Sequence, residues 1–244
     1  MAREKTAALI VIGNEILSGK IADTNSSFLA AELRALGVSL RRILVIPDEV
    51  DVIAEAVRAY QPAHDVLFTS GGVGPTHDDV TMTGVARGLG REVIRHPYLE
   101  AKMREFFGSD LNDARLKMAE VVAGSTLLFE GNLSFPTIQV ENIYILPGIP
   151  EIFREKFTAI RQRFTVDPFH LRVIYARVQE TCIADYLNRT IESFPDLLLG
   201  SYPKLHDPEY RVRVTLESKD QQYLEQAFQA LMSMLPPSAV VRTE

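Results

Sequence analysis

The feature that most constrains the fold is a regular alternation of strand and helix patterns in the first half of the chain. Short apolar segments rich in β-branched residues alternate with longer segments whose apolar residues recur at helical spacing. These segments are residues 7–12 (strand), 25–36 (helix), 38–46 (strand), 50–60 (helix), 65–69 (strand) and 78–89 (helix). Because such connections are right-handed crossovers, the pattern predicts a mostly parallel sheet covered by helices on both faces.

The pattern changes after residue 90. Two helices are expected at residues 97–107 and 113–121, and three short strands at residues 126–129, 137–140 and 143–146. The dipeptide Glu141-Asn142 between the last two strands predicts a tight hairpin turn. Pro150 then begins an amphipathic helix that we expect to close the first domain near Phe164.

The remaining residues follow a β-α-β-β-α-β order, which is typical of a ferredoxin-like module. We therefore predict two domains, residues 1–164 and residues 165–244. The fold class is α/β: a three-layer, doubly wound, mostly parallel sheet with a small α+β ferredoxin-like second domain.

Charge and composition exclude several kinds of partner. The formal net charge is −6 and basic residues are not clustered, so we expect no nucleic acid partner. No apolar run approaches the roughly 20 residues that span a bilayer, and the first residues lack a signal-peptide pattern, so we expect no membrane partner. A single cysteine, Cys182, makes no internal disulfide, which favours the reducing cytoplasm.

The most distinctive loop follows the third predicted strand, at residues 69–81 (TSGGVGPTHDDVT). Its glycines let the backbone approach a ligand, and the helix that follows offers the positive end of its dipole to a phosphate. The expected ligand contacts are Ser70, Gly71, Gly72, Gly74, Pro75, Thr76 and Thr81. The loop has neither the Gly-Lys-Ser/Thr ending of a Walker A motif nor a G-x-G-x-x-G fingerprint.

Two adjacent carboxylates, Asp78 and Asp79, end this loop. Either one could simply cap the following helix. One aspartate is enough for a cap, so the second is available to bind a metal ion or to polarise a water molecule. We expect Asp79 to be the essential carboxylate.

Three other loops follow predicted strands, where ligands of doubly wound sheets bind. The first strand is followed by Gly13, Asn14 and Glu15, which suit a tight turn that presents backbone N–H groups to a ligand beside the Glu15 carboxylate. The alternative is a purely structural turn with a solvated glutamate. Asp48 follows the second strand and is either a helix cap or a further functional carboxylate. Gly148 follows the late hairpin, where a purely structural turn also explains the sequence.

Together these loops resemble the molybdopterin-binding domain family, which includes the MoaB and Mog proteins and the amino-terminal part of CinA. The resemblance covers about residues 7–164 and is strongest over residues 71–81, with support from residues 13–19, 23–25 and 146–150. Residues 46–50, 96–97, 200–203 and 212–218 resemble the version of this domain found at the amino end of eukaryotic FAD synthases. No counterpart of the adenylyltransferase domain occurs in these residues, so FAD synthesis is not expected.

The resemblance implies metal-dependent cleavage of a nucleotide diphosphate such as FAD or ADP-ribose to AMP and a second phosphate product. Asp48 and Asp79 would then be catalytic, and Glu15, Asp78 and Asp79 would bind a magnesium, manganese or cobalt ion. The alternatives are a molybdopterin-binding or adenylylating step in molybdenum cofactor synthesis and a non-catalytic nucleotide-binding module. The partner is a small nucleotide or pterin ligand in each case, and related domains suggest a homo-oligomer.

Overall fold

The computed structural model describes residues 4–131 and 133–244, which divide into two compact units. The first unit ends at Val166 and the second begins at Asp167, two residues beyond the boundary predicted from the sequence. Within the described part of the chain, no helix combines the length and the apolar character needed to cross a bilayer.

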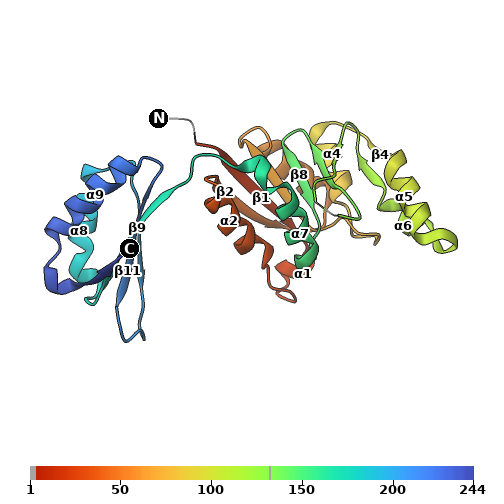
Figure 1. Cartoon of the computed structure of the whole chain (residues 1–244). Coiled ribbons are helices and arrows are strands. Elements are labelled where there is room, and N and C mark those ends of the chain that lie inside the picture. The colour runs from red at the N-terminus through yellow and green to blue at the C-terminus, as the bar shows by residue number, and fades with distance from the viewer. Residues whose placement is uncertain (1–3, 132) are drawn as a thin grey trace. The chain divides into compact units, whose positions relative to one another are not determined.

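The first unit is built on a six-stranded sheet with the order β2-β1-β3-β8-β7-β6 (Figure 1). Its strands are β1 (Thr6–Ile12), β2 (Ser39–Ile46), β3 (Val66–Ser70), β6 (Thr126–Leu128), β7 (Thr137–Val140) and β8 (Ile143–Leu146). Strands β2, β1, β3 and β8 run parallel, while β7 and β6 are antiparallel to their neighbours. The mostly parallel sheet expected from the alternating pattern is confirmed.

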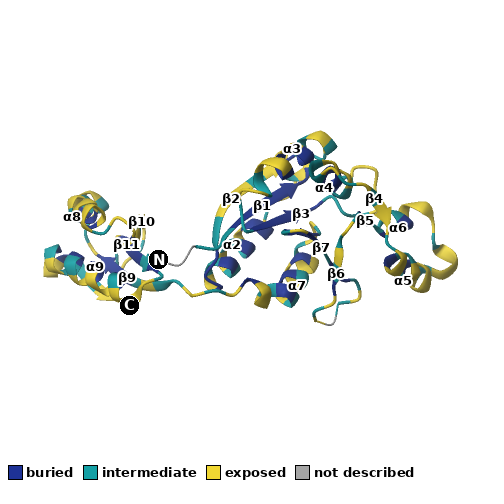
Figure 2. Ribbon diagram, turned by 90° about the horizontal axis from the view of Figure 1, so that it is seen from above, coloured by how far each residue is buried: buried dark blue, intermediate teal, exposed yellow. Residues whose placement is uncertain are grey.

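Helices cover both faces of this sheet (Figure 2). Helices α2 (Asn25–Ala35) and α7 (Pro150–Ile160) pack with one set of alternate β1 residues, including Leu9. Helices α3 (Val50–Tyr60) and α4 (Thr81–Leu89) pack with the other set, including Ile10. Because both faces of β1, β3 and β8 are buried, their sequences do not alternate between buried and exposed residues, and even Thr69 and Ser70 at the end of β3 are buried.

The segment after α4 departs from the sequence-based expectation. The predicted helix over 113–121 ends early: α6 covers Asp113–Lys117, and Glu120–Val122 forms β5. Strand β5 pairs with β4 (Val93–Arg95), which the sequence pattern did not predict. Three-residue strands are too short to show a period of two, so only their pairing defines them. With α5 (Pro97–Phe107), they enclose a small separate core around Leu99, Met103 and Val121.

The second unit is an antiparallel sheet with the order β10-β11-β9-β12, packed against two helices. Its elements are β9 (His170–Ala176), α8 (Glu180–Ser193), β10 (Leu198–Pro203), β11 (Val212–Ser218), α9 (Gln221–Met234) and β12 (Val240–Thr243). This order and topology confirm the predicted ferredoxin-like second domain. Apolar residues of both helices and of one sheet face form its core.

Candidate functional site

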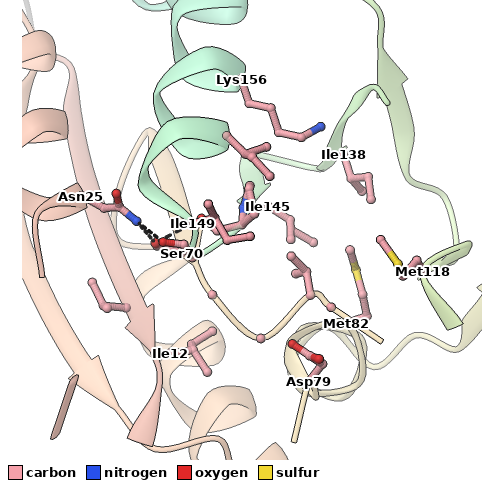
Figure 3. Close-up of a pocket in the computed structure, with 18 of the residues that line it drawn as sticks. Ile12, Asn25, Ser70, Asp79, Met82, Met118, Ile138, Ile145, Ile149 and Lys156 are labelled. Atoms are coloured by element: carbon pink, nitrogen blue, oxygen red, sulfur yellow. Dashed lines mark hydrogen bonds between the residues drawn. The ribbon is translucent and has the colours of Figure 1, made fainter. Parts of the chain in front are cut away.

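The carboxyl ends of the parallel strands meet at one edge of the first unit, where they border a cavity of about 620 Å³. This volume lies within the roughly 300–1,000 Å³ that is usual for small-molecule sites. The loops after β1, β3 and β8 all contribute to its lining (Figure 3). The predicted ligand residues among the lining are Glu15, Ser70, Gly71, Gly72, Gly74, Pro75, Asp79 and Gly148.

The glycine loop lies against the end of β1 too closely for any side chain. Gly71 has φ of 102°, and a Cβ atom there would lie 2.2 Å from the carbonyl oxygen of Ile12. Gly72 has φ of 64°, and a Cβ atom there would lie 2.3 Å from Oγ1 of Thr81. Both positions therefore require glycine for close approach as well as for backbone conformation.

Asn25 ties the glycine loop to the loop after β8. Its buried amide donates hydrogen bonds from Nδ2 to Oγ of Ser70 at 3.0 Å and to the carbonyl oxygen of Gly148 at 2.9 Å (Figure 3). Gly148 also lies directly against Gly71, since a Cβ atom on it would be 3.3 Å from the Cα atom of Gly71. Asn25 was not predicted as a site residue, although it belongs to the short motif at residues 23–25.

Asp79 organises the glycine loop and does not cap the following helix. Its Oδ2 accepts hydrogen bonds from the backbone N–H of Thr76, at 2.7 Å, and from the Thr76 hydroxyl. Helix α4 begins at Thr81, with Val80 at the N-cap and no side-chain cap. The helix therefore starts three residues later than expected. Neither Asp78 nor Asp79 caps it, so the alternative explanation of these two aspartates as helix caps is excluded. Asp79 lines the cavity.

Thr81 has a structural role that differs from the expected contact with a ligand. It is fully buried, and its hydroxyl donates to the carbonyl oxygen of Gly71 at 2.8 Å. Its backbone N–H donates to the carbonyl oxygen of Gly72. Thr81, Thr76 and Gly13 are not among the residues that line the cavity.

A second, open hollow beside the cavity gathers three predicted carboxylates. Glu15, Asp48 and Asp78 line it together with Asn14. Oδ2 of Asp48 accepts a hydrogen bond from the backbone N–H of Asn14 at 2.7 Å, which fixes the start of the first loop. The pKa of Asp78 is lowered, chiefly by the nearby Thr76 hydroxyl and its own backbone N–H, which favour the ionised form of this exposed carboxyl.

The carboxylates fit a metal ion only if a ligand completes its coordination. No three histidine, cysteine, aspartate or glutamate residues in the described part of the chain come together closely enough to hold a metal ion. Magnesium, however, is usually bound by one or two carboxylates together with substrate phosphates and water. Glu15 lines both the cavity and the hollow, so its carboxylate is suited to an ion that arrives with a phosphorylated ligand.

Two lysines of the cavity were missed by the sequence analysis. The ammonium of Lys117, at the end of α6, donates to the carbonyl oxygen of Thr76 in the glycine loop. Lys156, on α7, lines the cavity at a distance from Asp79 (Figure 3). The cavity is also lined by Ile149 and Ile152. Lys156 follows Ile152 by four residues, and Ile152 follows Ile149 by three, so the three residues share one face of the helix. This spacing was the only signal that the sequence offered.

The fold and the site define a class: an α/β protein whose glycine loop, at the carboxyl edge of a parallel sheet, lines a cavity of the size usual for small-molecule sites. Comparison with known families agrees. Residues 8–165 match the family model described as a probable molybdopterin binding domain, and residues 168–244 match the middle domain of FAD synthase. The chain belongs to the molybdopterin-binding domain family.

Individual relatives are similar in sequence to nearly the whole chain. A protein of Archaeoglobus fulgidus is 34% identical over 93% of this chain and 96% of its own length. A probable FAD synthase of Caenorhabditis elegans is 33% identical over 96% of this chain, which spans only 51% of that relative. The crystal structure of the protein CinA from Thermoplasma acidophilum, 30% identical, covers 66% of this chain and 100% of its own, with a TM-score of 0.61.

Proposed function

We propose that this protein is a metal-dependent nucleotide pyrophosphatase that cleaves FAD or ADP-ribose. One water molecule adds across the pyrophosphate, one P–O bond breaks, and the products are AMP and FMN, or AMP and ribose phosphate. The observation that carries the proposal is that the Gly71–Gly74 backbone and the Asp79 carboxylate line the same cavity, beside the hollow with three carboxylates. The similarity to FAD synthases favours a dinucleotide as the substrate.

The glycine loop is suited to hold the pyrophosphate. Gly71, Gly72 and Gly74 have no side chain between the loop backbone and the cavity, so a phosphate can come close to it, and the Lys117 ammonium beside Thr76 adds positive charge. Because Asn25 joins this loop to Gly148, the phosphate-binding backbone is preorganised before the ligand arrives. Binding therefore costs little reorganisation.

Asp79 is suited to orient the attacking water. One of its oxygens, Oδ2, is occupied by Thr76, and this contact fixes the carboxylate in the wall of the cavity. The other oxygen is then left to accept a proton from water in a defined direction. Asp48 would act indirectly, because its bond to the Asn14 N–H holds the first loop in place.

One or two of the carboxylates of Glu15, Asp78 and Asp79 would hold a divalent ion that enters with the substrate, and the substrate phosphates and water would complete its coordination. When bound, such an ion would offset the negative charge of the pyrophosphate and lower the pKa of a coordinated water. Oxygen ligands of this kind suit magnesium, manganese and cobalt.

Turnover of defined dinucleotides tests the proposal. The wild-type protein is incubated with FAD or ADP-ribose and each of the three metal ions, and AMP is separated by chromatography. We expect AMP from the wild type and a loss of at least about 10²-fold in the Asp79→Asn variant, the usual scale for a general base. Asp51→Asn is the matched control, because Asp51 is an exposed aspartate on α3. Wild-type turnover by a folded Asp79→Asn variant would exclude the assigned role.

A step in molybdenum cofactor synthesis is the second candidate. The family description over residues 8–165 favours it, since it names a probable molybdopterin binding domain. Saturable binding of molybdopterin with no release of AMP from any dinucleotide would replace the first proposal with this one. Binding of nucleotide without either activity would leave a nucleotide-binding module.

A further inference from the structure

The cavity has two chemically different ends. Asp79 lies at one end with the polar glycine loop, and Lys156 lies at the other, as Figure 3 shows. Between them the lining is mainly apolar and includes three methionines, from α4, α5 and the end of α6. The apolar residues of this part include Met82, Met103, Met118, Phe135, Ile138 and Ile145. A pyrophosphate needs only the first end, so the second end is left for another part of the ligand.

Lys156 is an unusual residue for such a wall. Two of its three N–H donors bond the carbonyl oxygens of Phe135 and Pro136, at 2.9 and 2.7 Å. No other acceptor among the described residues lies within hydrogen-bond distance of Nζ, and none of their ion pairs includes this lysine. Burial lowers its pKa to about 8. A lysine with one unused donor, on the wall of an apolar cavity, is suited to an acceptor on a ligand.

The surrounding side chains indicate what kind of ligand carries that acceptor. Methionine side chains adapt their shape and make favourable contacts between sulfur and aromatic rings. Met82 and Met118 come from α4 and from the end of α6, and Phe135 adds an aromatic ring to the same lining. These residues suit a flat ring system, and the ammonium of Lys156 suits a carbonyl oxygen at its edge.

We propose that this apolar end is a subsite for a flat heteroaromatic ring with carbonyl oxygens, such as the ring of a flavin, and that Lys156 donates to one of them. The inference rests on the proposed function in one respect, because it takes the ligand phosphates to lie on the glycine loop. It makes Lys156 a specificity-determining residue: it selects the second half of the dinucleotide and leaves phosphate binding to Lys117 and the loop.

Binding of FMN and AMP tests the subsite, because both carry a phosphate but only FMN has carbonyl oxygens on its ring. FMN affinity is measured by flavin fluorescence and AMP affinity by calorimetry. We expect Lys156→Met to weaken FMN binding about tenfold, the scale of one hydrogen bond to a charged group, with AMP binding changed by less than about twofold. Lys156→Arg should retain most of the FMN affinity, since arginine keeps the donors.

Two further variants separate the subsite from a general structural effect. Lys117→Met should weaken FMN and AMP alike, because Lys117 contacts the glycine loop. Met118→Ala should weaken FMN binding about threefold through the lost contact with the ring, and should spare AMP. Met118 is only half-buried, so the variant is expected to fold.

The subsite is overturned if the wild type does not bind FMN, if Lys156→Met leaves FMN binding unchanged, or if it weakens FMN and AMP equally. These outcomes differ from failure of the hydrolase proposal. Lys156-dependent FMN binding without turnover of any dinucleotide would keep the subsite and remove the hydrolase. Turnover of ADP-ribose, together with FMN binding that does not depend on Lys156, would keep the hydrolase and remove the subsite.

Discussion

Replacement of Gly71 by alanine should destabilise the first unit strongly, for two reasons that the structure separates. The φ angle of 102° is unfavourable for any residue with a Cβ atom, and that atom would lie 2.2 Å from the carbonyl oxygen of Ile12. Backbone strain of this kind costs about 1–3 kcal/mol, and forced overpacking costs about 1–3 kcal/mol more. We therefore expect a loss of about 4 kcal/mol, below the roughly 5–15 kcal/mol by which domains are usually stable.

Gly19 provides the matched control. It has φ of 71°, and a Cβ atom there would meet nothing within 4 Å, so Gly19→Ala introduces left-handed strain without the contact. Its expected cost is about 1–2 kcal/mol. Hydrogen exchange of the β1 and β3 amides, measured by mass spectrometry, reports the free energy of opening of this unit in both variants. An equal loss in the two variants would refute the argument that contact with Ile12 requires glycine at position 71.

Two further predictions concern residues that the structure added to the site. Asn25→Ala should lower the free energy of unfolding by about 1–3 kcal/mol, because it leaves the Ser70 hydroxyl and the Gly148 carbonyl without their donor. Urea unfolding measures this, and a loss under 0.5 kcal/mol, on the order of a neutral surface change, would contradict it. The second concerns Lys156, whose pKa is lowered from 10.5 to about 8 by burial. Between these pH values the unfolded chain binds more protons than the folded one, so stability should rise with pH there. Unfolding of Lys156→Met should lack this rise, and an identical pH profile would exclude the burial effect.

Much of the first unit was predictable because its chemistry is local. The alternation of strand and helix patterns predicted a mostly parallel sheet covered on both faces, and Gly37 and Gly90, directly after the predicted helices 25–36 and 78–89, have the positive φ of a helix end. The hairpin was also predictable: Val140 pairs with Ile143, and Glu141 adopts the positive φ of 52° that a two-residue turn requires.

Some contacts of the glycine loop, and one strand pair, were not predicted from the sequence. The Asp79 carboxylate accepts from Thr76, and α4 has no side-chain cap, so the alternative of a capping aspartate is excluded for Asp79. The buried Thr81 hydroxyl donates to the carbonyl oxygen of Gly71. The pairing of β4 with β5 was missed because it joins two three-residue segments that α5 and α6 separate in the sequence.

The sequence alone determined the fold class, the two-part organisation and the loops that border the candidate site. Strand and helix periodicity, and the fact that parallel strands end at one edge of a sheet, are sufficient for that. Only the tertiary structure decided which side chains meet in the cavity. Asn25, Lys117 and Lys156 lie on three helices far apart in the sequence, and they border one cavity because those helices pack around the same end of the sheet. Periodicity specifies which face of a helix is buried, but which groups meet across a cavity depends on how several elements pack together.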